Sequence, residues 1–229
     1  MDKFFLKFDD PYADMNFARA RKMFPSLMKF ETTKSIVESH KSCAARSFTN
    51  QFMVIDADNY MLDFSLDDVY SAVKEKNKIY IFRAKNPVND LEYGHGGVKV
   101  FQRELFVDQD VIDFSTSFVG QVCVVNQTLS IHSFNVDPFH AWRTAVRECV
   151  KLSAEIIPNR NAEDDEYRLD VWCSKFNNVK NAEFVELGAK FGREFGHTNK
   201  DRPLMLKRIN DFKWLKQQYE QMVAGQSSV

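Results

Sequence analysis

The sequence predicts an α/β protein with a mostly parallel central sheet, flanking helices and a helical C-terminal part. Strand-like and helix-like segments alternate over residues 3–55, as in sheets whose strands are joined by crossover helices. Helix-like segments dominate the last third of the chain. Neither an internal repeat nor a low-complexity linker interrupts the 229 residues, so we expect one domain over residues 1–229.

The N-terminal part is expected to hold three strands and two helices. Pro25 ends the first helix, and Thr32 is expected to cap the second. In order, the expected elements are strand 3–10, helix 13–24, strand 27–31, helix 32–48 and strand 51–55. In sheets of this kind, ligands gather at the carboxyl ends of the strands.

The strongest helix signal lies at residues 137–157. Asp137 is its expected cap, Pro138 fits its first turn, and apolar residues follow at a 3.6 period. A polar loop is expected at 159–167 and a frayed end at 224–229. The remaining expected elements are helix 66–76, strand 78–84, a turn-rich stretch 86–101 ending in a short strand, strand 118–127, and helices 183–196 and 209–222.

Composition excludes several classes of protein. The formal net charge of -1 offers no global attraction for nucleic acid, although it leaves room for a local basic patch. No apolar run approaches the roughly 20 residues of a membrane span, so no membrane partner is expected. The N-terminus lacks signal-peptide character. Four widely spaced cysteines favour neither a zinc ribbon nor a disulfide framework, so a reducing cytoplasm is the expected location.

Two carboxylates, Asp56 and Asp58, follow directly after the third expected strand. A calcium loop of the EF-hand type requires glycine where Met61 stands, so this interpretation fails. A haloacid-dehalogenase-type phosphatase normally has Thr or Val where Tyr60 stands and carries its motif after the first strand, which leaves a weak alternative. A GT-A-type glycosyltransferase uses Asp-x-Asp at a strand end to hold Mg²⁺ or Mn²⁺ against a sugar-nucleotide diphosphate. A solvated acidic loop is the alternative without function.

The segment HKSCAARSFTNQFMVIDADN resembles the approach to the metal motif in family-2-like GT-A glycosyltransferases. Together with NPVNDLEYGHGGVKVF, FHAWRTAVRECVKL and INDFKWL, it resembles small glycosyltransferase-like proteins of T-even-like tailed bacteriophages, over residues 4–215. This resemblance implies a GT-A-like nucleotide-sugar-binding fold. Residues 1–101 would then form the nucleotide-binding half, and residues 102–229 the acceptor half with the C-terminal helices.

The same resemblance implies the substrates. The donor would be a nucleotide sugar, taken to be a UDP-sugar. The acceptor would be 5-hydroxymethylcytosine in double-stranded phage DNA, and the sugar glucose or arabinose. The protein would then act in the cytoplasm of the infected host cell.

The resemblance also assigns residues to the donor site. Asp56 and Asp58 match the metal motif, with Ala57 between them at the donor. Asp9 and Asp10, at the end of the first strand, stand where such enzymes contact the nucleoside. His40 and Lys41 precede the motif strand and are candidates for the base or ribose. For His40, a surface helix position is an equal alternative.

A glycine cluster forms the second candidate region. Gly94, Gly96 and Gly97 permit positive φ and close approach of the backbone to a ligand. His95 and Lys99 would then reach the donor sugar or diphosphate. A plain β-turn is the alternative, and the absence of a following Gly-Lys-Ser/Thr excludes a Walker loop.

The expected helix 137–157 carries a cationic stripe. Arg143 and Arg147 lie one turn apart and are candidates for phosphate binding, or else they pair with Glu148 on a solvated face. If the reaction inverts configuration, Asp113 and Glu148 are candidate general bases; if it retains configuration, no base is needed.

A third metal ligand is expected from late in the chain. His197 is the first candidate, with His132 behind it. A DNA acceptor would also require a flipped base and phosphate contacts, for which residues 19–22 and 200–208 are candidates, both equally consistent with ordinary surface charge.

Three other functions stay open. The first is glycosyl transfer to a protein or glycan, and the second is a non-catalytic nucleotide-sugar-fold protein that binds DNA or a host factor. The third is a metal-dependent phosphohydrolase.

Overall fold

The computed structural model describes residues 1–33, 35–107, 121–156 and 162–226. Contacts group them into two compact units, one of residues 1–87 and 92–133, the other of residues 88–91 and 134–229. One boundary between these units therefore lies at Ser133 and Phe134. The expected division into halves at residues 101 and 102 is a functional one and stays a prediction.

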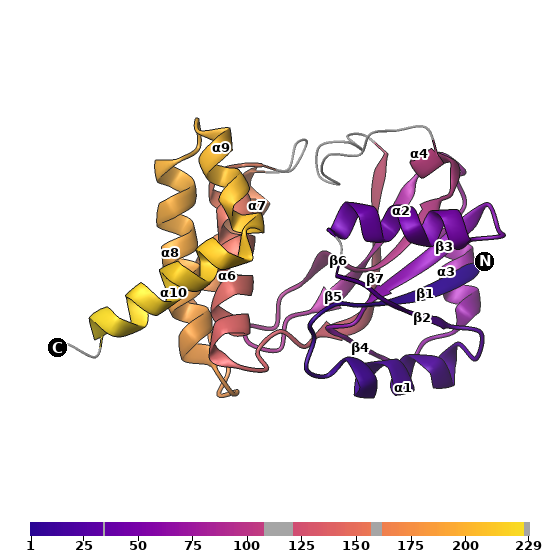
Figure 1. Ribbon diagram of the computed structural model, residues 1–229, viewed down its shortest axis with the longest axis horizontal. Helices are drawn as coiled ribbons and strands as arrows, with labels where there is room; N and C mark the ends of the chain where they lie inside the picture. The colour runs from indigo at the N-terminus through magenta and orange to yellow at the C-terminus, as the bar shows by residue number, and fades with distance from the viewer. Residues whose placement is uncertain (34, 108–120, 157–161, 227–229) are drawn as a thin grey trace. The chain divides into compact units, whose positions relative to one another are not determined.

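The first unit is built on a seven-stranded sheet in the order β2-β1-β3-β6-β5-β7-β4 (Figure 1). The strands are β1 (Asp2–Lys7), β2 (Met28–Glu31), β3 (Gln51–Asp56), β4 (Asn59–Met61), β5 (Ile79–Lys85), β6 (Glu92–Gln102) and β7 (Val122–His132). β1 runs parallel to β2 and β3, and β5 runs parallel to β7. β6 is antiparallel to both β3 and β5, and β4 is antiparallel to β7. Five strands thus share one direction, which confirms the α/β class with a mostly parallel sheet.

Helices cover both faces of this sheet. They are α1 (Ala13–Met23), α2 (Ile36–Arg46), α3 (Leu66–Ala72) and the short α4 (Glu104–Val107). Alternate strand residues point to opposite faces: Phe5 of β1 joins the core with α1 and α3, whereas Phe4 and Leu6 join the core with α2 and α4. β1 and β3 are buried on both faces along their middle residues, and this explains their continuous apolar runs.

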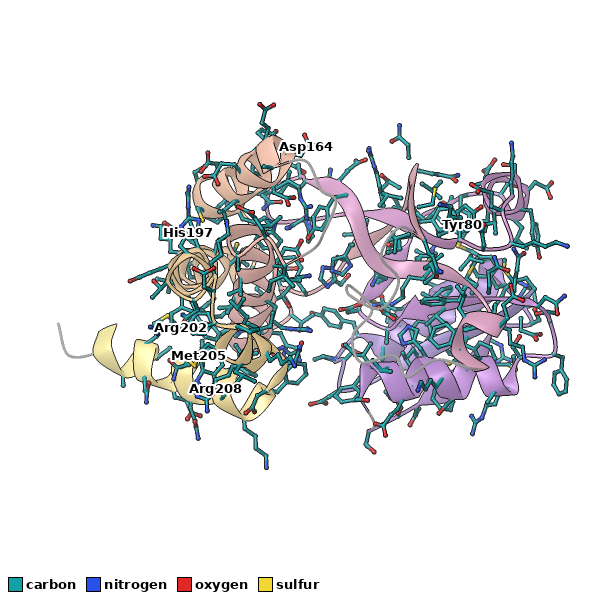
Figure 2. The ribbon with its side chains drawn as sticks, turned by 90° about the horizontal axis from the view of Figure 1, so that it is seen from above. Tyr80, Asp164, His197, Arg202, Met205 and Arg208 are labelled. Carbon is teal, nitrogen blue, oxygen red and sulfur yellow. The ribbon has the colours of Figure 1, made fainter. Side chains whose placement is uncertain are left out.

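The second unit is helical. It contains α6 (Pro138–Ser153), α7 (Ala162–Ser174), α8 (Ala182–Thr198), α9 (Pro203–Leu206), the 3₁₀ helix η1 (Lys207–Asn210) and α10 (Phe212–Gln226). The expected cap of α6 is confirmed, since Asp137 Oδ1 accepts a hydrogen bond from the His140 backbone N–H at 2.9 Å. Figure 2 shows side chains of this unit, among them His197, Arg202 and Met205.

Glycines set the packing of α8 on α6. Gly188, Gly192 and Gly196 recur every four residues, and a Cβ on any of them would collide with α6. For Gly188 the collision is with the backbone of Trp142, and for Gly192 with the carbonyl of Val146 at 2.7 Å. A backbone cannot yield as a side chain does, so these two helices approach closely only because the stripe lacks side chains.

Four expectations about local structure are wrong. The expected polar loop at 159–167 is helical from Ala162 onward, because α7 opens on acidic residues that suit a helix N-terminus. The second helix is capped by Ser35, whose side chain forms a capping box with Glu38, and not by Thr32. The turn-rich stretch 86–101, expected to end in a short strand, is strand from Glu92 onward, because the eleven-residue β6 runs from there to Gln102. The end expected to fray from residue 224 stays helical to Gln226.

Substituting Gly188 by alanine is expected to destabilise the protein by roughly 1–3 kcal/mol, because the new methyl group strikes the α6 backbone. Denaturant unfolding followed by circular dichroism measures this change. Gly225→Ala is the matched control: its Cβ would meet no atom within 4 Å, so stability should hold or rise slightly. Equal behaviour of the two variants would contradict the packing argument.

Candidate functional site

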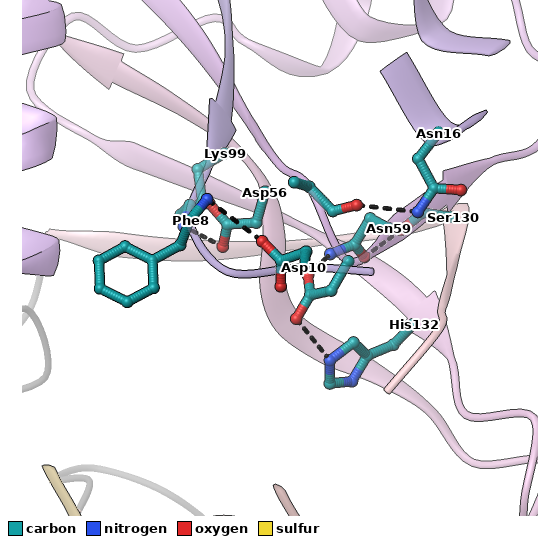
Figure 3. Close-up of polar contacts among 10 residues, drawn as sticks. Phe8, Asp10, Asn16, Asp56, Asn59, Lys99, Ser130 and His132 are labelled. Carbon is teal, nitrogen blue, oxygen red and sulfur yellow. Dashed lines mark hydrogen bonds and ion pairs between the residues drawn. The ribbon is translucent and has the colours of Figure 1, made fainter. Parts of the chain in front are cut away.

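Two carboxylates, those of Asp56 and Asp58, lie at the carboxyl end of β3. Phe52 through Ile55 are buried, and Asp56 ends the strand. The chain then turns at Ala57 and Asp58 before β4 begins at Asn59. The buried amide of Asn16 on α1 donates to the Ala57 carbonyl at 2.8 Å and holds this turn (Figure 3).

Asp56 is paired with a lysine on the neighbouring strand. Lys99 Nζ lies 2.8 Å from Asp56 Oδ2, because Lys99 stands opposite Val54 in the β3–β6 register and its side chain reaches diagonally to the residue two positions along β3. The other oxygen, Oδ1, is buried and has no hydrogen-bond partner in the part of the chain that the structure describes. Burial raises the pKa of Asp56, and the nearby Lys99 only partly opposes it.

The side chain of Asp58 is held by residues of β7 and β4. His132 Nε2 lies 3.0 Å from its Oδ2, and the Asn59 amide donates to its Oδ1 at 2.6 Å. Ser130 in turn donates to Asn59 Oδ1 at 2.9 Å. Burial alone would raise the pKa of Asp58, but the charge and hydrogen bond of His132 outweigh it and the pKa is lowered. Asp58 is therefore ionised throughout the physiological range.

His95 stacks on His132. The two ring centroids are 3.6 Å apart with planes inclined by 35°. The β5–β6 register shifts between Ile81 and Arg83, and this bulge carries the histidine. Gly96 there has φ +86°, and a side chain on Gly97 would collide with Asn59. The glycine cluster is thus a bulge inside a strand, where its lack of side chains admits Asn59.

These contacts bring together residues far apart in the chain. Asp56, Asp58, His95 and Lys99 meet as the sequence suggested, although their roles stay predictions. Sequence reasoning gave no role to Asn16, Asn59 and Ser130 and held His132 only in reserve. Of these four residues, only Asn59 had a signal in the sequence, because it directly follows Asp58. His132 comes into place because it pairs with Asn59 in the β4–β7 register.

The other candidates of the first unit have different surroundings. Asp9 and Asp10 follow β1, which is parallel to β3, and Asp10 accepts a hydrogen bond from the Phe8 N–H at 3.3 Å (Figure 3). Lys41 is half-buried on α2. His40 is buried, with its ring centroid 5.3 Å from that of Phe101 and its Nδ1 2.8 Å from the Ile36 carbonyl. Burial holds the pKa of His40 well below its usual range, so this side chain is neutral.

The candidates of the second unit make contacts within that unit. Arg143 lies over the rings of Phe139 and Phe212, and Arg147 over Phe212. His197 is exposed in the last turn of α8.

The two candidate general bases are Glu148 and Asp113. Glu148 is buried, with Oε1 2.6 Å from Arg168 Nη2 and Oε2 2.6 Å from Lys151 Nζ. Both of its oxygens are thus engaged, which favours a structural role over that of a base. Asp113 lies outside the described residues.

A metal at this site would have few protein ligands. Within residues 1–33, 35–107, 121–156 and 162–226, no three His, Cys, Asp or Glu side chains are grouped so as to hold a metal ion. The Asp56 oxygen that lacks a partner and the hard carboxylate pair nevertheless suit Mg²⁺ or Mn²⁺. Mg²⁺ commonly binds through one or two carboxylates, with water and substrate phosphates completing its shell. The donor set therefore fits an ion that arrives with a diphosphate.

No protein-family model matches the chain, and no curated protein matches it. Solved structures with similar folds include TarS from S. aureus, with 10% identity, a TM-score of 0.41, and coverage of 87% of this chain and 45% of TarS. A glycosyltransferase involved in glycosylation of the major capsid of PBCV-1 has 12% identity and a TM-score of 0.36, covering 55% of this chain and 81% of its own. HddC from Yersinia pseudotuberculosis has 12% identity and a TM-score of 0.38, covering 56% and 71%. Similarities this low assign neither a family nor an activity.

Among the described residues, no helix combines the length and apolar character needed to span a bilayer.

Substituting His132 by glutamine is expected to raise the pKa of Asp58 toward its ordinary value of 3.8, because the substitution removes the charge but keeps a hydrogen-bond donor. The lowered pKa of Asp58 contributes stability that is present above the unfolded value and lost as pH falls through the folded value. As the pH is lowered, the free energy of unfolding of the variant should therefore begin to fall at a higher pH than that of the wild type.

Carboxyl-carbon NMR titration of Asp58 measures this shift directly. His140→Gln, which alters the separate His140–Asp137 pair, is the matched control and should leave Asp58 unchanged. An Asp58 titration identical in wild type and His132→Gln would rule out this role for the histidine.

Proposed function

We propose that this protein is a GT-A-type glycosyltransferase that uses a nucleotide sugar and binds the donor diphosphate at the carboxyl end of β3. The observation that carries the proposal is the pair Asp56 and Asp58 at the end of a buried strand, surrounded by Lys99, His95 and His132. Two acids with three nitrogen-bearing side chains beside them suit a ligand that has negative oxygens and arrives with a cation.

The departing nucleoside diphosphate gains negative charge as the glycosidic bond breaks. A Mg²⁺ or Mn²⁺ ion held by Asp56 and Asp58 would neutralise that charge when bound. Lys99 sits 2.8 Å from Asp56, so its ammonium is placed to donate to a phosphate oxygen at the same edge. His132 stands beside Asp58 and is proposed to hold that carboxylate in position, since the described residues contain no group of three His, Cys, Asp or Glu side chains suited to a metal ion.

The remaining donor contacts follow from strand order. Asp9 and Asp10 come after β1, and parallel pairing with β3 puts them at the same sheet edge. They are the proposed contacts to the nucleoside, taken to be uridine. His95 with Gly96 and Gly97 is proposed to contact the sugar, because the bulge brings this backbone to the aspartates' edge of the sheet.

For the acceptor we favour the hydroxyl of 5-hydroxymethylcytosine in double-stranded DNA, in the cytoplasm of a phage-infected cell. Arg21, Lys22, Arg202, Lys207 and Arg208 are exposed and suit phosphate contacts. Arg19 is already engaged, since it donates to the Met61 carbonyl at 3.0 Å and pairs with Asp63.

If the reaction inverts configuration, a base must take the acceptor proton. Asp113 is then the carboxylate to test first, because both oxygens of Glu148 already lie beside cations.

A non-catalytic nucleotide-sugar-binding protein is the second candidate. The Asp56–Lys99 and Asp58–His132 pairs favour it, because each aspartate already has a neutralising neighbour. Such a protein would bind the donor without a divalent ion and transfer nothing.

Donor binding has a direct test in thermal stability. UDP with Mn²⁺ is expected to stabilise the wild type by about 2.7 kcal/mol when UDP is present at a hundredfold excess over its Kd. Asp56→Asn with Asp58→Asn should abolish the effect of Mn²⁺, while Asp67→Asn with Asp68→Asn, an exposed pair at the start of α3, should keep it. Equal stabilisation with Mn²⁺ and with a chelator would favour the non-catalytic protein.

Transfer itself is tested with DNA. Incubation with a panel of UDP-sugars and Mn²⁺ is expected to add a hexose or pentose to hydroxymethylated DNA and not to unmodified DNA, as nucleoside mass spectrometry measures. The Asp56→Asn/Asp58→Asn variant should lose at least about a hundredfold in rate, if the ion stabilises the leaving group. Full transfer by that variant would sink the proposed site, and transfer only to a protein or glycan would move the acceptor.

A further inference from the structure

A cavity lies at the amino-terminal end of β3, away from Asp56 and Asp58. It has a volume of about 770 Å³, within the size range of small-molecule sites. Its lining includes Asn50, Gln51, Tyr70, Lys74, Lys76 and Arg103. We propose that this cavity binds a nucleoside phosphate, either as a free nucleotide or as part of a single nucleic-acid strand.

The cavity is separate from the proposed donor site. β3 begins at Gln51, which lines the cavity, and ends at Asp56. Strands rise about 3.3 Å per residue, so roughly 17 Å of sheet lies between the two. Neither Asp56 nor Lys99 is among the lining residues. A ligand here would therefore bind independently of the donor.

One wall is a turn that a single carboxylate holds in place. Asp2 Oδ2 accepts hydrogen bonds from the backbone N–H of Phe48 at 2.7 Å and of Thr49 at 3.1 Å, and from the Ser47 hydroxyl at 3.0 Å. Burial opposes ionisation of Asp2, yet these donors lower its pKa. The turn that leads into Asn50 and Gln51 is thus fixed before any ligand arrives.

Further lining residues come from the segment between α3 and β5. The Glu75 backbone N–H donates to the Tyr80 hydroxyl at 2.6 Å, and Tyr80 is buried in the sheet (Figure 2). The Gln102 amide makes two longer contacts, each 3.4 Å, to the carbonyls of Glu75 and Lys78. Because Glu75 is anchored, Lys74 and Lys76 on either side of it stand at defined positions over the cavity.

The charges of the lining match a phosphate. Lys74, Lys76 and Arg103 form no ion pair with any residue that the structure describes. Arg103 Nε is in addition buried without a hydrogen-bond partner in that part of the chain. A buried guanidinium donor with no acceptor is costly, and a phosphate oxygen would satisfy it. Among the lining residues that the structure describes, Glu104 is the one carboxylate.

The aromatic and amide groups match the nucleoside. Tyr70 lines the cavity and is 45% exposed, so its ring offers a surface on which a base can stack. The side-chain amides of Asn50 and Gln51 carry both donors and acceptors, as the edge of a base requires. A bare inorganic anion would use the cations alone, which makes a nucleoside phosphate the better fit.

Titration of the full-length protein with AMP, followed by amide NMR, tests the inference. Shifts are expected at Thr49–Gln51, Lys74–Lys76 and Arg103, and they should appear equally in the Asp56→Asn/Asp58→Asn variant, whose donor site is altered. The Lys74→Gln/Lys76→Gln/Arg103→Gln variant should bind AMP about tenfold or more weakly. Lys180→Gln/Lys190→Gln/Lys213→Gln removes the same charge from exposed lysines elsewhere and should bind normally.

Each outcome has a distinct meaning. Retained AMP binding in the cavity variant, or shifts confined to Asp56 and Asp58, would overturn the inference. Equal binding of inorganic phosphate and AMP would also overturn it, because the base would then contribute nothing. Tighter binding of a short oligothymidylate than of TMP would identify a strand as the source, and equal binding would identify the free nucleotide. Asp56→Asn/Asp58→Asn should bind AMP normally even if no sugar transfer is ever detected.

Discussion

The structure depends on how it stabilises two carboxylates at the end of a buried strand. Burying an ionised group costs several kcal/mol unless charges and hydrogen bonds compensate. Lys99 compensates Asp56 from β6, and His132 with Asn59 compensates Asp58 from β7 and β4. The antiparallel strand β6, its bulge and the short strand β4 are the elements that bring these partners to the carboxyl end of β3.

This compensation also limits what the site can bind. A ligand at the two aspartates must either supply a cation of its own or leave Lys99 and His132 in place. A diphosphate with a divalent ion satisfies the first condition. The ion takes the carboxylate oxygens, and the diphosphate oxygens accept hydrogen bonds from Lys99. The two carboxylates differ, because burial raises the pKa of Asp56 while His132 outweighs burial and lowers the pKa of Asp58.

Sequence periodicity predicted the elements whose signal is local. The buried run before Asp56, the capped helix after Asp137 and the alternation of strands and helices all follow from neighbouring residues. The glycines of β6 indicated a turn because a bulge and a turn need the same backbone freedom. His132 lies 74 residues from Asp58, and only the β4–β7 register joins them. Asn16 shows the same limit, since nothing near it marks a contact with Ala57.

Anomalous diffraction from crystals grown with UDP and Mn²⁺ locates the proposed metal directly. One manganese peak is expected within bonding distance of carboxylate oxygens of both Asp56 and Asp58, with the diphosphate on its other side and within reach of Lys99. Manganese bound elsewhere, or UDP bound with Lys99 and Asp56 still paired and no metal between them, would contradict the proposed site.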